Sequence, residues 1–290
     1  MKYHILYNPI SGSGRATEAI DRVKSLIDGE CTVTSIIDVK DYAEYFSTIA
    51  PEDTLVICGG DGTLNRFVND IRDNKIGWRV CYYACGTGND FLHDIKGEVT
   101  PELIEINKYI ENLPVADING KSYRFINGIG YGIDGYCCEE GDRLRALSDK
   151  PVDYTAIAIK GLLLKYKPAD ATVTVDGVEY KYKKVWIAPT MNGRMYGGGM
   201  IPTPDQDRLS PDKKVSVMIL YGKSRLGTLM MFPSIFKGEH VKYTDAVAVH
   251  TGKEITVKYG VPRPLQVDGE TITDVCEYTV HCDALVAAKK

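Results

Sequence analysis

The chain has 290 residues, of which 44% are hydrophobic and 26% are charged, and its formal net charge is −4. This composition is that of an ordinary folded globular protein, and the length allows two domains. The negative charge argues against a protein that mainly holds nucleic acid. No apolar run approaches the ~18 residues that a membrane span needs, and no secretion signal precedes the first strand pattern. The eight cysteines contain no C-x-x-C pair, so we expect free thiols in a reducing cytoplasm.

The first half of the chain alternates strand-like and helix-like patterns. Apolar residues in short continuous or alternating runs predict strands, whereas apolar residues three or four apart predict helices. The predicted order is a strand at 3–7, a helix at about 16–27, a strand at 32–37, a helix at 42–49, a strand at 54–58, a helix at 64–71 and a strand at 79–84. This order predicts a parallel sheet covered by helices.

The second half is dominated by strand patterns, with one helical stretch at 152–166. Asp176-Gly177 and Asp268-Gly269 are typical of two-residue hairpin turns. The expected strands lie at 171–175, 178–184, 185–188, 215–221, 254–259, 265–267 and 278–282. We therefore expect an antiparallel β-sandwich, with residues 1–122 as an α/β domain and residues 123–290 as the second domain.

The stretch Gly59-Gly60-Asp61-Gly62-Thr63 connects the third predicted strand to the helix after it. Such a turn points backbone N–H groups toward the start of the helix, and glycines allow a phosphate to approach closely. An acid among these groups would repel a bare phosphate. Asp61 is therefore expected to meet Mg²⁺ or to take a proton from an attacking hydroxyl; the alternative is a tight turn with Asp61 as a helix cap.

Three further stretches contain groups that suit contact with a nucleotide or its phosphates. Asn8-Pro9 with Ser11-Gly12 follows the first strand, and Gly86-Thr87-Gly88-Asn89-Asp90-Phe91 follows the fourth. In open α/β sheets, ligands bind at the carboxyl ends of strands. Asp268-Gly269-Glu270 places an acid after the second hairpin turn, whereas Asp176-Gly177-Val178 forms a similar turn without one. Each stretch alone is also compatible with an ordinary turn.

Other common site motifs are absent from the sequence. Gly120-Lys121-Ser122 and Gly222-Lys223-Ser224 lack the first glycine of a P-loop. Gly128-Ile129-Gly130-Tyr131-Gly132 has a misplaced third glycine for dinucleotide binding. The five histidines are scattered without metal-ligand spacing.

In order and spacing, the four stretches at Asn8, Gly59, Gly86 and Asp268 resemble the diacylglycerol kinase catalytic family, which includes bacterial lipid kinases and sphingosine kinases. Gly193 with 196–200 is similar to the glycine-rich strand of the family's second domain. The segment 125–127 is similar to its interdomain entry. The resemblance implies a phosphofructokinase-like α/β domain and a β-sandwich, with ATP and lipid meeting in the cleft between them.

The resemblance also implies roles for individual residues. Asp61 would act at the reacting phosphate as metal partner or base, and Glu270 would reach the same reaction from the sandwich. A structural Mg²⁺ would bind in the second domain through acids among Asp205, Asp207 and Asp212, of which we favour Asp207 and Asp212. ATP would bind through Asn8, Ser11, Gly12, Gly59, Gly60, Gly62, Thr63, Gly86, Thr87, Gly88, Asn89 and Asp90.

The sequence departs from the family pattern at two positions and leaves two alternatives open. Arg66 stands where the family usually has an acid, and Leu92 replaces a usual small residue, which affects details of nucleotide contact. An NAD kinase shares Gly-Gly-Asp-Gly-Thr and the two-domain plan. A non-catalytic nucleotide-sensing module would need only the phosphate loops.

The resemblance also implies where the protein acts. ATP and Mg²⁺ would be required, and the acceptor would be a lipid alcohol at the inner face of the membrane, reached without crossing it. We expect no nucleic-acid partner and leave a homodimer open. The helical stretch 152–166 is one candidate for membrane contact, although packing inside the second domain is the favoured reading.

Overall fold

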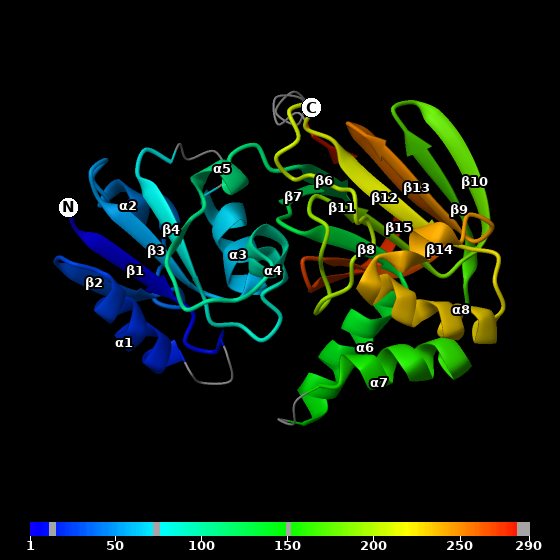
Figure 1. Ribbon diagram of the computed structural model, residues 1–290, viewed down its shortest axis with the longest axis horizontal. Helices are drawn as coiled ribbons and strands as arrows, with labels where there is room; N and C mark the ends of the chain where they lie inside the picture. Colours follow the sequence, from blue (N-terminus) through cyan, green and yellow to red (C-terminus); the bar gives the residue numbers. More distant parts are fainter. Residues whose placement is uncertain (12–15, 72–75, 149–151, 283–290) are drawn as a thin grey trace. The chain divides into compact units, whose positions relative to one another are not determined.

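A computed structural model describes residues 1–11, 16–71, 76–148 and 152–282. The chain forms two compact units, Met1–Glu111 and Asn112–Lys290 (Figure 1). This division lies before the boundary expected after residue 122. The reason is that β6 (Val115–Ile118) and β7 (Lys121–Arg124) form a hairpin whose first strand pairs with β15 of the second unit.

The first unit is built on a five-stranded sheet in the order β2-β1-β3-β4-β5. The first four strands are parallel, and the short β5 pairs antiparallel with β4. The strands are β1 (Tyr3–Tyr7), β2 (Cys31–Ser35), β3 (Thr54–Gly59), β4 (Arg79–Ala84) and β5 (Ile104–Glu105). The predicted parallel α/β arrangement is confirmed.

Helices cover both faces of this sheet, so the central strands are apolar throughout. Val56 of β3 packs with Val23 of α1, whereas Tyr82 of β4 points to the other face, where its ring lies 5.9 Å from that of Phe91 in α4. Burial on both faces explains why β3 is a continuous apolar run instead of an alternating one. The helices are α1 (Ala16–Leu26), α2 (Tyr42–Ser47), α3 (Asp61–Ile71), α4 (Asp90–Lys96) and α5 (Asn107–Ile110).

The second unit contains one ten-stranded sheet, in the order β13-β12-β11-β8-β14-β15-β6-β7, from which β9 and β10 branch at β14. All of its strand pairs are antiparallel. Besides β6 and β7, the strands are β8 (Gly128–Gly132), β9 (Ala169–Val175), β10 (Val178–Val185), β11 (Ile187–Met191), β12 (Val215–Leu220), β13 (Val247–Gly252), β14 (Glu254–Val267) and β15 (Glu270–His281).

The branch allows the sheet to enclose a core as a β-sandwich does. The runs expected as strands at 254–259 and 265–267 are the two ends of β14, with a register shift between Lys258 and Arg263. One end pairs with β9 and the other with β8. Tyr131 of β8 and Tyr259 of β14 consequently meet inside the sandwich, with ring centroids 4.7 Å apart. The expected sandwich and both Asp-Gly hairpins are confirmed.

Helices of the second unit cover a second core on the outer side of β11 and β12. Val217 of β12 faces the sandwich core, whereas Met218 packs with Leu162 and Met231 beneath the helices. The helical segments are α6 (Ile133–Leu147), α7 (Tyr154–Lys160), η2 (Gly161–Lys165), α8 (Arg225–Met231), η3 (Phe232–Lys237) and η4 (Glu239–Lys242). Along the described part of the chain, no helix has the length and apolarity needed to cross a membrane.

The first turn of α6 contains a buried acid. Asp134 is buried, and the Tyr196 hydroxyl donates a hydrogen bond to its Oδ2. Gly130 leaves the room for this side chain, because a Cβ there would lie 2.4 Å from Asp134 Oδ2. Burial raises the pKa of Asp134 to about 7, and the hydrogen bond from Tyr196 offsets only part of this effect.

The raised pKa predicts that Asp134 makes stability depend on pH. Between pH 3.8, the ordinary pKa, and about 7, the folded protein holds a proton that the unfolded chain releases. The free energy of unfolding of the wild type, relative to Asp134→Asn, should therefore fall by up to about 4 kcal/mol across this range and level off above it. Denaturant titrations at several pH values measure this difference. A difference that does not change with pH would mean that Asp134 is ionised in the folded protein.

Candidate active site

Three loops of the first unit meet at one edge of its sheet. They follow β1, β3 and β4, which are adjacent and parallel, so that their carboxyl ends lie side by side. Backbone hydrogen bonds continue beyond the strands, from Asn8 N to Cys58 O at 3.2 Å and from Cys85 N to Gly59 O at 2.9 Å. The fold therefore gathers the loops at Asn8, Gly59 and Gly86, as ligand-binding α/β sheets do.

Thr63 connects the loop after β1 to the first turn of α3. Its buried hydroxyl accepts a hydrogen bond from Asn8 Nδ2 at 3.1 Å and lies 3.1 Å from the Ser11 hydroxyl. These contacts join two candidate nucleotide-binding segments that are more than fifty positions apart in the sequence. The predicted ligand residue Gly12 lies outside the described residues.

Glycines allow the loops after β3 and β4 to touch. A Cβ at Gly86 would lie 2.5 Å from the Cα of Gly60, and a Cβ at Gly59 would lie 2.4 Å from the Thr63 side chain. Distances this short would require the backbone or a packed side chain to move. The fold itself thus requires glycine at 59 and 86, whether or not a ligand binds.

Asp61 joins the two loops through its carboxylate. Its Oδ2 accepts a hydrogen bond from Asp90 N at 2.9 Å, and its Oδ1 accepts one from Phe91 N at 3.0 Å. N–H groups in the first turn of a helix have no partner within the helix, and a negative charge is favourable there. Asp61 therefore caps α4, which follows the next strand, while it begins α3 itself.

A second carboxylate lies next to that of Asp61. A Cβ at Gly88 would lie 3.5 Å from Asp61 Oδ2 and 3.7 Å from Asp90 Oδ2, so both carboxylates border the same small space, which glycine leaves unfilled. Mg²⁺ is usually held by one or two carboxylates together with water and phosphate oxygens. The residues present therefore fit a magnesium ion at Asp61 and Asp90.

Asn89 holds the loop before α4 in a conformation that few residues adopt. Its φ is 53°, in the left-handed region, and its Nδ2 donates to Gly86 O at 2.9 Å. Its buried Oδ1 has no hydrogen-bond partner among the described residues. Thr87, two positions earlier, is exposed. Asn89 thus stabilises the loop, while Thr87 remains accessible to a ligand.

Gly62 differs from the other glycines of this edge. It lies in the first turn of α3 without a positive φ, and a Cβ there would meet no atom within 4 Å. The described structure gives no packing reason for glycine at this position, and glycine lowers helix stability. A ligand that approaches the backbone closely would explain its presence.

In the second unit, Asp268 holds the hairpin that carries Glu270. Its carboxylate accepts hydrogen bonds from the backbone N–H groups of Ile126, Asn127 and Gly128. Glu270 itself is exposed at the start of β15. The sequence motif pointed to Glu270 but gave no role to Asp268, whose partners lie about 140 positions earlier in the chain.

The acids expected to hold a structural metal have other partners. Asp207 Oδ1 accepts a hydrogen bond from Leu209 N at 2.9 Å, and Asp212 pairs with Lys214 Nζ at 3.2 Å. Within the described ranges, no three His, Cys, Asp or Glu side chains form a group that could hold a metal. The site at Asp207 and Asp212 therefore remains a prediction.

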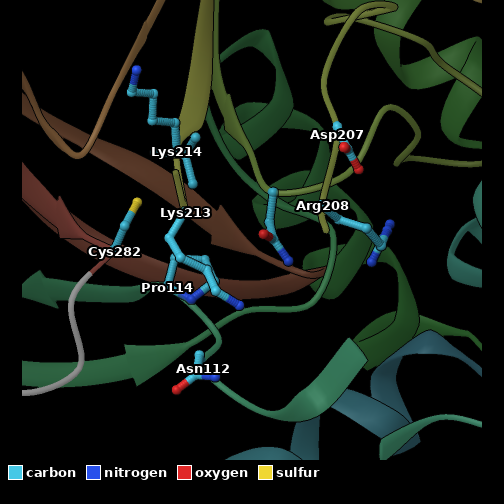
Figure 2. Close-up of a pocket in the computed structure, with 9 residues that line it drawn as sticks. Asn112, Pro114, Asp207, Arg208, Lys213, Lys214 and Cys282 are labelled. Carbon is cyan, nitrogen blue, oxygen red and sulfur yellow. The ribbon is translucent and has the colours of Figure 1, made fainter. Parts of the chain in front are cut away.

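Asp207 lies at a small pocket of the second unit that is rich in basic residues. The Arg208 guanidinium donates hydrogen bonds there to the Ile126 carbonyl at 3.1 Å and to Asn127 Oδ1 at 3.2 Å. Figure 2 shows this pocket, which is lined by Asn112, Pro114, Asn192, Asp207, Arg208, Lys213, Lys214, Val215 and Cys282. The excess of positive side chains disfavours a cation in the pocket itself.

Comparison with known families identifies both halves of the chain. Residues 2–115 match the diacylglycerol kinase catalytic domain, and residues 127–286 match the YegS C-terminal NAD kinase beta sandwich-like domain. The chain belongs to the diacylglycerol kinase catalytic family. It is accordingly a phosphotransferase of the diacylglycerol and lipid kinase type.

Individual relatives agree with this family. A diacylglycerol kinase of Mycobacterium tuberculosis is 26% identical over 269 residues, covering 89% of this chain and 85% of the relative. A diacylglycerol kinase of Staphylococcus aureus is 26% identical over 289 residues, covering 92% and 85%. The crystal structure of a diacylglycerol kinase from Bacillus anthracis has the same fold, with a TM-score of 0.60, 16% identity, and coverage of 97% of this chain and 93% of that chain.

Substitution by alanine should have opposite effects on stability at Gly62, where a Cβ would meet no neighbour, and at Gly86, where it would press on Gly60. Gly62→Ala should stabilise the protein by about 0.5–1 kcal/mol, because alanine favours the helix and its Cβ meets no neighbour. It should weaken nucleotide binding about tenfold, which corresponds to about 1.4 kcal/mol. Gly86→Ala should instead destabilise the fold by about 1–3 kcal/mol through its contact with Gly60. Thermal unfolding and calorimetric ATP titration measure both effects; unchanged ATP affinity in Gly62→Ala would contradict phosphate approach at this position.

Proposed function

We propose that the protein transfers the γ-phosphoryl group of ATP to the hydroxyl of a diacylglycerol-like lipid alcohol, with Mg²⁺ as cofactor. The observation that carries the proposal is the Asp61 carboxylate, which stands among backbone N–H groups beside a second carboxylate and an open glycine. Membership of the family supplies the class of reaction.

The loops at the sheet edge would bind the nucleotide. Backbone N–H groups near Gly62 and the accessible side chain of Thr87 would face the phosphates, and the polar side chains of Asn8 and Ser11 would line the same edge. The contacts of Thr63 and Asn89 hold these loops before substrate arrives, so that little order has to be gained on binding.

Asp61 would act at the reacting phosphate. As the lipid hydroxyl oxygen bonds to the γ-phosphorus, the bond from that phosphorus to the β–γ bridging oxygen breaks and ADP leaves. The hydroxyl proton has to be accepted, and Asp61, oriented by the start of α4, is a suitable acceptor. Asp61 and Asp90 would hold Mg²⁺, which when bound would neutralise phosphate charge.

Glu270 of the second unit would take part in the same reaction. Its side chain is exposed, while the hydrogen bonds that the Asp268 carboxylate accepts hold the backbone of its hairpin in place. A phosphoryl transfer needs its nucleophile oriented as well as deprotonated, and two acids can divide these tasks. Because a diacylglycerol-like acceptor stays in a bilayer, the reaction would occur at the cytoplasmic membrane surface.

Asp61→Asn is the principal test of the proposal. The variant keeps the volume of the side chain and removes its charge, so kcat with diacylglycerol should fall about a hundredfold or more. Activity is measured as ADP release with diacylglycerol, with NAD as an alternative acceptor, and folding is followed by thermal unfolding. Turnover near that of the wild type in a folded Asp61→Asn variant would overturn the assignment. Turnover by the wild type with NAD and not with diacylglycerol would favour the NAD kinase alternative.

Glu270→Gln should separate catalysis from nucleotide binding. Glu270 is exposed and the nucleotide loops belong to the first unit, so kcat should fall about tenfold or more while the Kd for ATP stays within about twofold. Asn89→Gly should mainly weaken ATP binding, since glycine tolerates the positive φ but removes the hydrogen bond to Gly86. Glu179→Gln, an exposed acid after the other Asp-Gly turn, is the matched control. An unchanged kcat in Glu270→Gln would leave Glu270 as a hairpin residue only.

A further inference from the structure

Two helical segments of the second unit present large apolar side chains to solvent. On α7 and η2 these are Ile159, Leu163 and Leu164, and on α8 and η3 they are Leu226, Met230 and Phe236. Leu164, Leu226 and Met230 are 72%, 62% and 75% exposed. We call these six residues the docking face. Apolar exposure grouped in this way is unusual for a surface that contacts only water.

The two segments are neighbours in space. Arg225 at the start of α8 donates a hydrogen bond to the Leu162 carbonyl of η2 at 2.9 Å. The helix α8 contacts both η2 and η3, and Figure 1 shows α8 beside the end of the α7 helix. The apolar residues of the docking face thus belong to adjoining helices.

The same helices already satisfy the core with other residues. Leu162 of η2, Met231 of α8 and Ile235 of η3 are buried against β11 and β12. The core therefore does not need Leu164 or Met230. Packing within the unit therefore does not explain why these two positions are apolar.

The charged residues within the two segments that carry the docking face are all basic. Residues 154–167 and 222–238 contain no acidic residue, although the whole chain has a net charge of −4. Their basic residues are Lys160, Lys165, Lys167, Lys223, Arg225 and Lys237. Lys223 pairs with Asp245. The nearby Glu140 of α6 is bound to Arg143, which with Lys165 and Lys160 lowers its pKa.

We propose that the docking face binds the surface of an anionic lipid bilayer. Apolar side chains inserted between lipids, ringed by lysines that reach the anionic headgroups, are the features of an interfacial helix. This proposal rests on the proposed function, since a diacylglycerol-like acceptor has to be reached in a bilayer. A second copy of the chain is disfavoured as the occupant, because two segments whose charged residues are all basic do not form a self-complementary surface.

Vesicle sedimentation tests the proposal with the full chain. The wild type should pellet with vesicles of phosphatidylcholine and phosphatidylglycerol, and much less with phosphatidylcholine alone or at high salt. The double variant Leu164→Glu, Met230→Glu should bind the anionic vesicles about tenfold more weakly. Val178→Glu changes an apolar residue that is 54% exposed on β10, outside the docking face, and should pellet like the wild type. Equal pelleting of the double variant and the wild type would overturn the proposal.

Kinase assays separate this proposal from the proposed function. With a short-chain diacylglycerol dispersed as monomers, the double variant should keep the wild-type kcat, whereas with diacylglycerol in anionic vesicles its rate should fall about tenfold. Anionic-vesicle binding by a wild type that phosphorylates no lipid would support docking and overturn the lipid kinase reaction. Loss of a dimer in light scattering, with unchanged vesicle binding, would assign the face to a second copy and overturn docking.

Discussion

The candidate site of the first unit depends on the two hydrogen bonds that the Asp61 carboxylate accepts from the start of α4. They connect the turn after β3 to the loop after β4. They also hold the carboxylate beside the space that a side chain at position 88 would occupy. The same charge therefore stabilises the loops and, in the proposed reaction, would supply the reactive group. A carboxylate fixed by backbone donors loses little orientational freedom when a substrate binds, so its position is prepared before the reaction begins.

In the second unit, the acid that anchors the backbone and the acid proposed to react are different residues. Asp268 anchors its hairpin to the backbone at 126–128, and the exposed Glu270 next to the turn is free of that task. In the proposed reaction, a mutation of Asp61 would thus change loop structure and chemistry together, whereas a mutation of Glu270 would leave the hairpin anchored. The interpretation of variants at the two acids has to take this difference into account.

Much of the fold could be predicted because its central strands are buried on both faces and are apolar throughout, as in β3. The helix α6 could not be predicted, because its buried face contains Asp134, Gly135 and Gly141 instead of regularly spaced apolar residues. A Cβ at Gly135 would lie 1.9 Å from the Pro264 carbonyl oxygen, so close packing there requires glycine. The glycines of β8 likewise belong to a buried strand.

The positions of the site residues followed from motifs, but their partners did not. Asp61 bonds to a loop 29 residues away, and Tyr196 reaches Asp134 across 62 residues. Neither contact has a local signature, because each depends on which strands become neighbours. The motif also gave no means of distinguishing Gly62, which the described packing does not require, from Gly86, which it does.

The two Asp-Gly hairpins have a consequence for how the family can vary. Asp176 and Asp268 both occupy the left-handed region and bind the backbone of a neighbouring segment through their carboxylates. The turn is thereby complete before the residue that follows the glycine, which is Val178 in one hairpin and Glu270 in the other. Evolution can exchange that residue without rebuilding the turn, and such a position is well suited to acquire or lose a reactive group while the sheet around it stays the same.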